Sequence, residues 1–264
     1  IFNRVASQKQ AAKWGRRDAT LNYGTNPCSE IILRDKQFCN LTEVVVRAND
    51  TKETLLEKVK LATILGTFQS TLDNFQFLSH EWKTNTTAER LLGVSLTGIM
   101  DNKMMSNPDP KFLEEMRDVA RKTNEKYAKR LDVQVSASIT CVKPSGTVSQ
   151  LVDSASGIHT RHSDYYVRTI RMDKKDAIYE FLKEKGVHVE DEQYRPESTA
   201  VFSFPIKSPN GSITRNDKTA LEQLDLWLTY QRYWCEHKPS VAISVKEHEW
   251  IDVGAWVYKH FEYM

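Results

Sequence analysis

The chain has little cysteine and no excess of charge of either sign. Four cysteines in 264 residues, with no C-x-x-C pair, are too few for a disulfide scaffold, so a reducing cytoplasmic location is expected. Lys and Arg number 37 against 35 for Asp and Glu, which excludes a strongly basic nucleic-acid-binding protein. No apolar run approaches the ~18 residues that span a bilayer, and no signal peptide is visible, so no membrane partner is expected. The seven histidines form no spaced ligand set, so we expect no metal site.

The composition is ordinary for a folded protein, with 40% hydrophobic and 27% charged residues. Expected strands alternate with expected helices, which predicts an α/β fold with a partly parallel sheet, in a single unit over residues 1–264. We expect helices over 1–15, 50–75, 86–98, 109–131, 174–185, 218–236 and 247–261. We expect strands over 31–33, 44–46, 133–141, 165–171, 199–206 and 240–246.

Two of these helices are predicted from their first residues. Asp50 with Glu53, and Thr86 with Glu89, match the spacing of a capping box. The second box predicts a helix that includes Gly93, where a glycine indicates close packing against a neighbour.

The segment 26–30 carries the residue types with the most chemistry. In an extended backbone, Asn26, Cys28 and Glu30 share one face, at steps of roughly 7 Å. An amide, a thiol and a carboxylate on one face can orient a substrate, perform radical or nucleophilic chemistry and move a proton. Pro27 places them in a loop or at a sheet edge. The alternative is a polar turn with a buried cysteine.

Cys39 follows Cys28 after eleven residues. If 31–33 and 44–46 form a hairpin around the turn 34–37, the two cysteines lie about 13 Å apart along the strand. A disulfide needs Cα atoms within about 7 Å, so we do not expect these two to bridge each other. Cys39 either has another partner or is a small core side chain.

The turn over residues 143–149 follows an alternating strand and is rich in small residues. If a helix begins at Thr147 or Ser149, its first amides form an anion site for which phosphate is the natural ligand. The alternative is an ordinary strand-to-helix turn.

Three motifs in order carry a resemblance to a known family. Residues 26–31 with 39–41 resemble the active-site signature of ribonucleotide reductases; 90–99 resembles a second family segment, and 141–149 with 156–159 a third. The chain looks most like the class II, adenosylcobalamin-dependent enzymes of the monomeric ribonucleoside-triphosphate reductase type. The eleven-residue cysteine spacing favours this type, because class I catalytic subunits place the second cysteine considerably further on.

The resemblance implies a ten-stranded α/β barrel with a finger loop through its centre. Cys28 matches the cysteine that becomes a thiyl radical and abstracts the substrate's 3′-hydrogen. Glu30 matches the carboxylate that takes the 3′-hydroxyl proton, and Asn26 the amide that holds the substrate hydroxyls. Cys39 matches one of two cysteines that supply reducing equivalents. The residues that match the cradle for the nucleotide phosphates are Ser145, Gly146, Thr147, Val148 and Ser149.

The same resemblance implies adenosylcobalamin as cofactor of the full-length enzyme, a ribonucleoside triphosphate substrate and a thioredoxin-type reductant. It also implies a longer chain. The partner of Cys39 and an allosteric site would precede Ile1, and a cysteine pair that relays electrons would follow Met264. We therefore expect a partial catalytic barrel domain without turnover of its own. Cys141 and Cys235 are interpreted as core residues. The alternatives are a fragment of a class I catalytic subunit and a non-catalytic α/β interaction domain.

Overall fold

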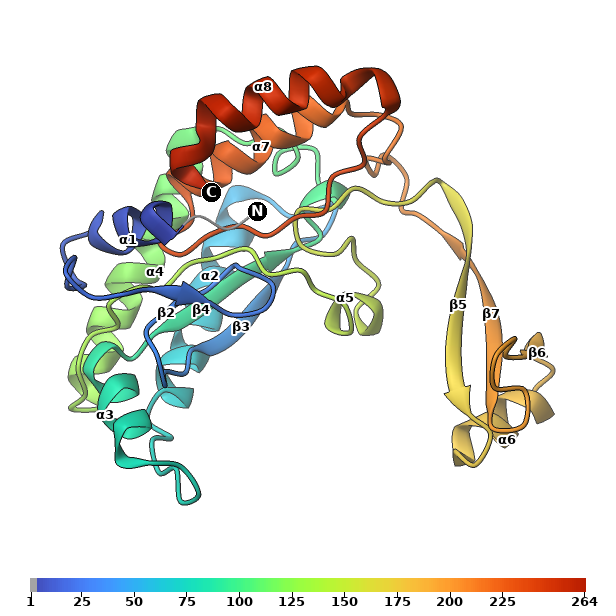
Figure 1. Ribbon diagram of the computed structural model, residues 1–264, viewed down its shortest axis with the longest axis horizontal. Helices are drawn as coiled ribbons and strands as arrows, with labels where there is room; N and C mark the ends of the chain where they lie inside the picture. Colours follow the sequence, from blue (N-terminus) through green and yellow to red (C-terminus); the bar gives the residue numbers. More distant parts are fainter. Residues whose placement is uncertain (1–3) are drawn as a thin grey trace. The chain divides into compact units, whose positions relative to one another are not determined.

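The computed structural model describes residues 4–264, which group into two compact units (Figure 1). One unit holds the chain up to Arg161 together with Gly211–Met264, and the other holds His162–Asn210. The assignment of 1–264 to one catalytic domain stays a prediction, because compactness does not define a catalytic domain.

Parallel strands form the centre of the first unit. β3 (Asn40–Val45) pairs in parallel with β4 (Leu92–Thr97) over their whole lengths. An extended segment lies along the other edge of β4, where Val94 and Thr140 form a parallel bridge. All six residues of β4 are buried, as a strand covered on both faces requires. The α/β class is therefore confirmed in outline, whereas the ten-stranded barrel and its finger loop stay predictions.

Two long helices lie side by side in this unit (Figure 1): the first packs against both strands, and the second packs along the first. They are α2 (Lys52–Gln69) and α4 (Pro110–Arg130). α4 begins as its sequence predicts, since the side chain of Asp109 caps it and a proline occupies its first turn. The remaining elements of the unit, apart from a hairpin described below, are α1 (Arg4–Ala12), α3 (His80–Glu89), α5 (Val148–Leu151), α7 (Ala220–Tyr233), α8 (Trp250–His260) and short 3₁₀ turns at Ile99–Asp101, Glu247–Glu249 and Phe261–Tyr263.

The predicted helix over 86–98 is wrong. α3 ends at Glu89, Arg90 adopts a left-handed conformation with φ of 40°, and the chain continues as β4. The run from Leu91 to Leu96 is buried on both faces, so it carries no alternation that would distinguish a strand from a helix. Gly93 does mark close packing, because a Cβ there would lie 2.4 Å from Cδ2 of Leu41.

Other boundaries also differ from expectation. α2 is capped by Thr51 with Thr54, not by Asp50 with Glu53, and it ends at Gln69 rather than at residue 75. The segments 133–141 and 240–246 form no regular strand: the first contributes an isolated bridge at Thr140 and single hydrogen bonds, and the second contributes single hydrogen bonds.

The second unit is a small antiparallel sheet with one helix. Its strands are β5 (Tyr165–Asp173), β6 (Val189–Asp191) and β7 (Thr199–Lys207), in the order β5-β7-β6. α6 (Ala177–Glu184) packs Tyr179 against Phe202 of the sheet. The two long strands and the helix were predicted from the sequence.

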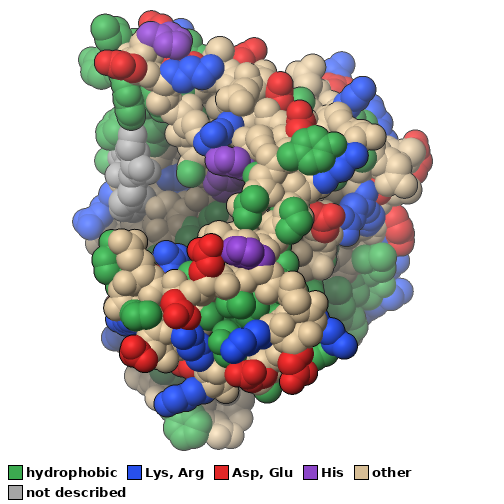
Figure 2. Space-filling view, turned by 90° about the vertical axis from the view of Figure 1, so that its right-hand side faces the viewer, with side chains coloured by type: hydrophobic (Ala, Val, Ile, Leu, Met, Phe, Trp, Pro, Cys, Tyr) green, Lys and Arg blue, Asp and Glu red, His purple; other side chains and the backbone are tan. Residues whose placement is uncertain are grey.

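Acidic and basic side chains are interspersed on the face shown in Figure 2, as the near-zero net charge suggests. Over the described range 4–264, no helix combines the length and apolar character that crossing a membrane requires.

Candidate active site

Cys28 lies at the tip of a short hairpin. The hairpin strands are β1 (Gly24–Thr25) and β2 (Ile32–Leu33), which pair antiparallel. Between them the chain turns at Pro27, where the amide of Ser29 donates to the carbonyl of Asn26 at 2.9 Å. The thiol of Cys28 is exposed at this turn.

The loop that Pro27 predicts is therefore confirmed, whereas the extended backbone that would place Asn26, Cys28 and Glu30 on one face is not formed; the chemistry expected of these residues stays a prediction. The turn itself brings Asn26 and Glu30 together, and Nδ2 of Asn26 donates to Oε1 of Glu30 at 2.7 Å. The amide oxygen of Asn26 accepts from the backbone N–H of Ile31 at 3.1 Å, which fixes the orientation of the side chain. The amide of Asn26 and the carboxylate of Glu30 thus meet where the chain enters and leaves the turn that carries Cys28.

Glu30 is fully buried, and its carboxylate is paired with a lysine. Nζ of Lys143 donates to Oε1 at 3.0 Å. Burial alone would lower the pKa of Lys143, but the hydrogen bond and charge of Glu30 raise that pKa above its ordinary value. Among the described residues, Oε2 of Glu30 has no hydrogen-bond partner. A buried carboxylate oxygen without a partner is costly unless a ligand or water completes it.

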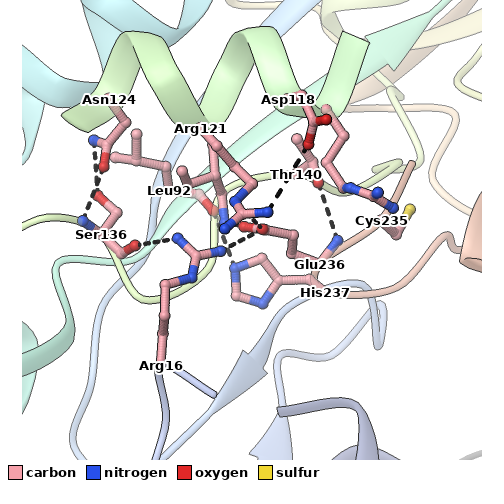
Figure 3. A network of polar contacts seen from close by, with 12 residues as sticks. Arg16, Leu92, Asp118, Arg121, Asn124, Ser136, Thr140, Cys235, Glu236 and His237 are labelled. Carbon is pink, nitrogen blue, oxygen red and sulfur yellow. Dashed lines mark hydrogen bonds and ion pairs between the residues drawn. The ribbon is translucent and has the colours of Figure 1, made fainter. Parts of the chain in front are cut away.

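Two side chains, one near each end of the sequence, form hydrogen bonds to the backbone of β2. Arg17 donates to the carbonyl of Ile32 at 2.9 Å and binds Glu89 through two nitrogens. Nδ1 of His237 accepts from the amide of Ile32 at 3.3 Å, and Nε2 donates to the carbonyl of Leu92 at 3.0 Å, as Figure 3 shows for the latter pair. Both ring nitrogens therefore have fixed roles, and the ring must be neutral to fill them.

Acid is expected to destabilise the protein through His237. Burial, with a contribution from the charge of Arg17, lowers the pKa of this ring from 6.5 to about 3. The unfolded chain takes up the proton near pH 6.5 and the folded chain does not, so stability is fully present above pH 6.5 and falls as the pH drops. The loss amounts to about 2 kcal/mol at pH 5.

Urea unfolding at pH 8 and pH 5 measures this loss, with His237→Asn as the matched variant. The variant is expected to be less stable at pH 8 but to lose about 2 kcal/mol less on acidification. An equal loss in both proteins would contradict the assignment. Arg16, Arg17 and His159, whose pKa is also lowered by burial, are present in both proteins, so their contributions to the pH dependence cancel in the comparison.

Cys39 lies just before β3 and is half-buried. The predicted hairpin over 31–46 is wrong, because β2 pairs with β1 and β3 pairs with β4. Burial raises the pKa of the Cys39 thiol, and the charges of Glu30 and Lys143 act on it. Cys28 and Cys39 do not bridge each other, as expected, and Cys141 and Cys235 are fully buried, as the core interpretation predicts.

The turn over 145–149 leads into α5, as predicted, and its serines bind one another. The amide of Ser149 donates to Oγ of Ser145 at 3.0 Å. Among the described residues, the amides of Gly146 and Thr147 have no acceptor. A cavity of about 590 Å³ lies against this turn, and its wall includes Lys143 and Glu43. Oγ of Ser145 donates to Oε2 of Glu43 at 2.7 Å, so the cavity contains an acidic group as well as a basic one.

A second cavity, of about 290 Å³, lies beside Cys28. Its wall is largely apolar and includes Trp227, Val241 and Met264. Lys238 also lines it, and burial lowers the pKa of this lysine to about 8. The thiol of Cys28 therefore faces a space that a small group can enter.

Three residues of the site were missed in the sequence. Lys143 lies within the motif at 141–149, which is the signal that places it near the site of Glu30. His237 and Lys238 lie about 200 residues from the hairpin, and no local pattern indicates their contact with it. Over the range 4–264, no cluster of three or more His, Cys, Asp or Glu side chains is placed to hold a metal ion.

Curated relatives agree with the motifs. The chain is 30% identical over 250 residues to the adenosylcobalamin-dependent ribonucleoside-triphosphate reductase of Euglena gracilis, and the aligned region covers 92% of this chain and 33% of the relative. It is 30% identical over 231 residues to a probable enzyme of the same name from Dictyostelium discoideum, covering 84% of this chain and 29% of the relative. It is 28% identical to the enzyme of that name from Lactobacillus leichmannii, covering 86% and 34%. No family model matches the chain.

Solved structures show the same fold. A B12-dependent (class II) ribonucleotide reductase superposes with a TM-score of 0.75 and 24% identity, over 90% of this chain and 37% of that one. The Actinobacillus ureae class Id ribonucleotide reductase alpha subunit superposes with a TM-score of 0.60 and 14% identity, over 98% and 55%. The chain spans about a third of the length of its curated relatives. Over nearly all of its own length, it is a relative of the class II, adenosylcobalamin-dependent ribonucleotide reductases.

Proposed function

We propose that the complete protein reduces ribonucleoside triphosphates to 2′-deoxyribonucleotides by thiyl-radical chemistry. The observation that carries this proposal is the hairpin turn, which carries the exposed thiol of Cys28 between Asn26 and Glu30, whose side chains are hydrogen-bonded to each other. The relatives supply the substrate class, because they are named ribonucleoside-triphosphate reductases.

The residues beside Cys28 fit part of an adenosylcobalamin. The cavity of about 290 Å³ is at the small end of ligand sites, so it admits a group of nucleoside size and not a whole cobalamin. Its apolar wall, with Trp227 and Val241, suits an uncharged group beside the thiol. When bound, the cofactor supplies homolytic cobalt–carbon chemistry, which takes a hydrogen atom from a thiol.

Each of the three residues of the hairpin has its own role in the reaction. Cys28, as a thiyl, takes the hydrogen atom from C3′ of the ribose and later returns it. Glu30 accepts the proton of the 3′-hydroxyl, and its unpartnered Oε2 is the oxygen free to do so. Asn26 exchanges its bond to Glu30 for bonds to the substrate hydroxyls.

Reduction requires two electrons and two protons. Cys39 and a second cysteine outside residues 4–264 supply them as a dithiol that becomes a disulfide, while the 2′-hydroxyl leaves as water. A thioredoxin-type dithiol restores the pair. Burial raises the pKa of Cys39, which keeps it a thiol able to give a proton.

Deoxyribonucleotide formation tests the proposal directly. The complete protein, given CTP, a dithiol and adenosylcobalamin without oxygen, is expected to form dCTP together with a paramagnetic signal at low temperature. The 264-residue chain alone is expected to form none. If the complete protein turns over without responding to adenosylcobalamin, the class I alternative replaces this proposal. If no deoxynucleotide forms under either condition, the non-catalytic alternative does.

A further inference from the structure

Lys143 stands between the carboxylate of the site and the cavity at the small-residue turn. Its Nζ donates to Oε1 of Glu30 at 3.0 Å, and the same side chain lines the cavity of about 590 Å³ with Ser145, Gly146 and Thr147. Its side chain is 33% exposed, whereas Glu30 is fully buried. One side chain therefore contacts the group expected at the ribose and the space expected to hold phosphates.

The ammonium group has donors left for a ligand. An ammonium carries three N–H donors, and the acceptor that it finds within residues 4–264 is Oε1 of Glu30. The amides of Gly146 and Thr147 also have no acceptor among the described residues. An anion in this cavity would thus meet two kinds of unused donor at once.

The negative charge of Glu43 makes the positive charge of Lys143 more important for binding an anion in this cavity. Its carboxylate lines the same cavity and accepts from Oγ of Ser145 at 2.7 Å. Without Lys143, a phosphate would meet a carboxylate and neutral amides, which is electrostatically poor. Lys143 is the cation that offsets Glu43 on this wall, and its charge is already shared with Glu30.

We infer that Lys143 is a shared cation: it binds the nucleotide phosphate and, in doing so, loosens its hold on Glu30. Phosphate oxygens and Glu30 use different N–H donors but share the charge of one ammonium, so each weakens the other's bond to it. Substrate lacking phosphate then leaves Glu30 tied to Lys143, whereas a nucleotide frees the carboxylate to take a proton. The inference rests on the proposed function for the identity of the ligand, but its test needs no turnover.

Calorimetry of CTP binding to the complete protein, with cytidine as a phosphate-free control, tests this coupling. Lys143→Met is expected to bind CTP about tenfold more weakly and cytidine unchanged, since a charge-assisted hydrogen bond is lost. Glu30→Gln is expected to bind CTP about three- to tenfold more tightly, because the ammonium is released. This gain is expected to vanish in Glu30→Gln/Lys143→Met.

The double variant guards against misfolding, since it leaves no buried charge without a partner. Glu43→Gln is the matched control, because it removes a carboxylate that lines the same cavity but has no hydrogen bond to Lys143. Removing this negative charge is expected to raise the affinity for CTP. That gain is expected to persist when Lys143→Met is added. Equal CTP affinity of wild type and Lys143→Met, or a Glu30→Gln gain that survives in the double variant, overturns the inference. Failure of the proposed function would show separately, as absence of dCTP from the complete protein.

Discussion

Replacing Cys28 by alanine in the complete protein is expected to abolish deoxynucleotide formation while leaving the fold and nucleotide binding intact. The side chain is exposed at a turn, so its loss changes the free energy of unfolding by less than about 0.5 kcal/mol. Turnover, by contrast, depends on this one sulfur atom, and a fall of at least about 10⁴-fold is expected, as for other groups that react directly with substrate.

The measurement pairs a dCTP assay with CTP calorimetry on the same preparation. Ser29→Ala is the matched control, because it alters the neighbouring side chain of the same turn and leaves the thiol in place. It is expected to keep activity within about threefold of wild type. Retained turnover in Cys28→Ala would remove the thiyl mechanism, and loss of CTP binding would mean that the substitution had disturbed the site rather than the chemistry.

Replacing Glu236 by alanine is expected to destabilise the first unit by about 3 kcal/mol. Its side chain is fully buried, and Figure 3 shows it between Arg16 and Arg121. Its Oε2 also accepts from the amide of Ile139 at 2.8 Å. The substitution leaves that amide without its acceptor, Arg16 without its counter-charge and Arg121 with the more distant Asp118 at 3.9 Å, although both guanidinium groups remain partly exposed to water.

Urea unfolding at neutral pH measures the loss. Asp118→Ala removes a half-exposed partner of Arg121 at 3.9 Å, and it is expected to cost less than about 0.5 kcal/mol. Similar small changes in both variants would mean that the arginines find water at no cost, and the buried network would then contribute little to the stability of the chain.

The parts of the fold that the sequence predicts well are those where local chemistry decides the outcome. Asp109 with Pro110 places the start of α4 correctly, and the strand expected over 165–171 lies within β5. β4 was missed because a fully buried parallel strand has no alternation, so only its neighbours on both faces distinguish it from a helix.

The candidate site divides in the same way. Residue types at 26–30 indicated the chemistry, but the turn at Ser29, with φ of 63°, changed the reason why Asn26 and Glu30 meet. Lys143 contacts Glu30 across 113 residues of sequence, and His237 contacts Ile32 across 205. Contacts at that separation follow from the assembled sheet, and no sequence window contains them.

The supports of the hairpin have a consequence for how the protein is made. The amide of Lys238 donates to the carbonyl of Glu30, and His237 holds Ile32, so the hairpin is closed by residues synthesised about 200 positions later. At roughly 5–20 residues per second, translation leaves it without these partners for about 10–40 s. During that interval Ile31 and Ile32, both fully buried in the folded chain, are exposed on the nascent chain beside the thiol of Cys28. The hairpin that carries Cys28 is thus made well before the residues that close it.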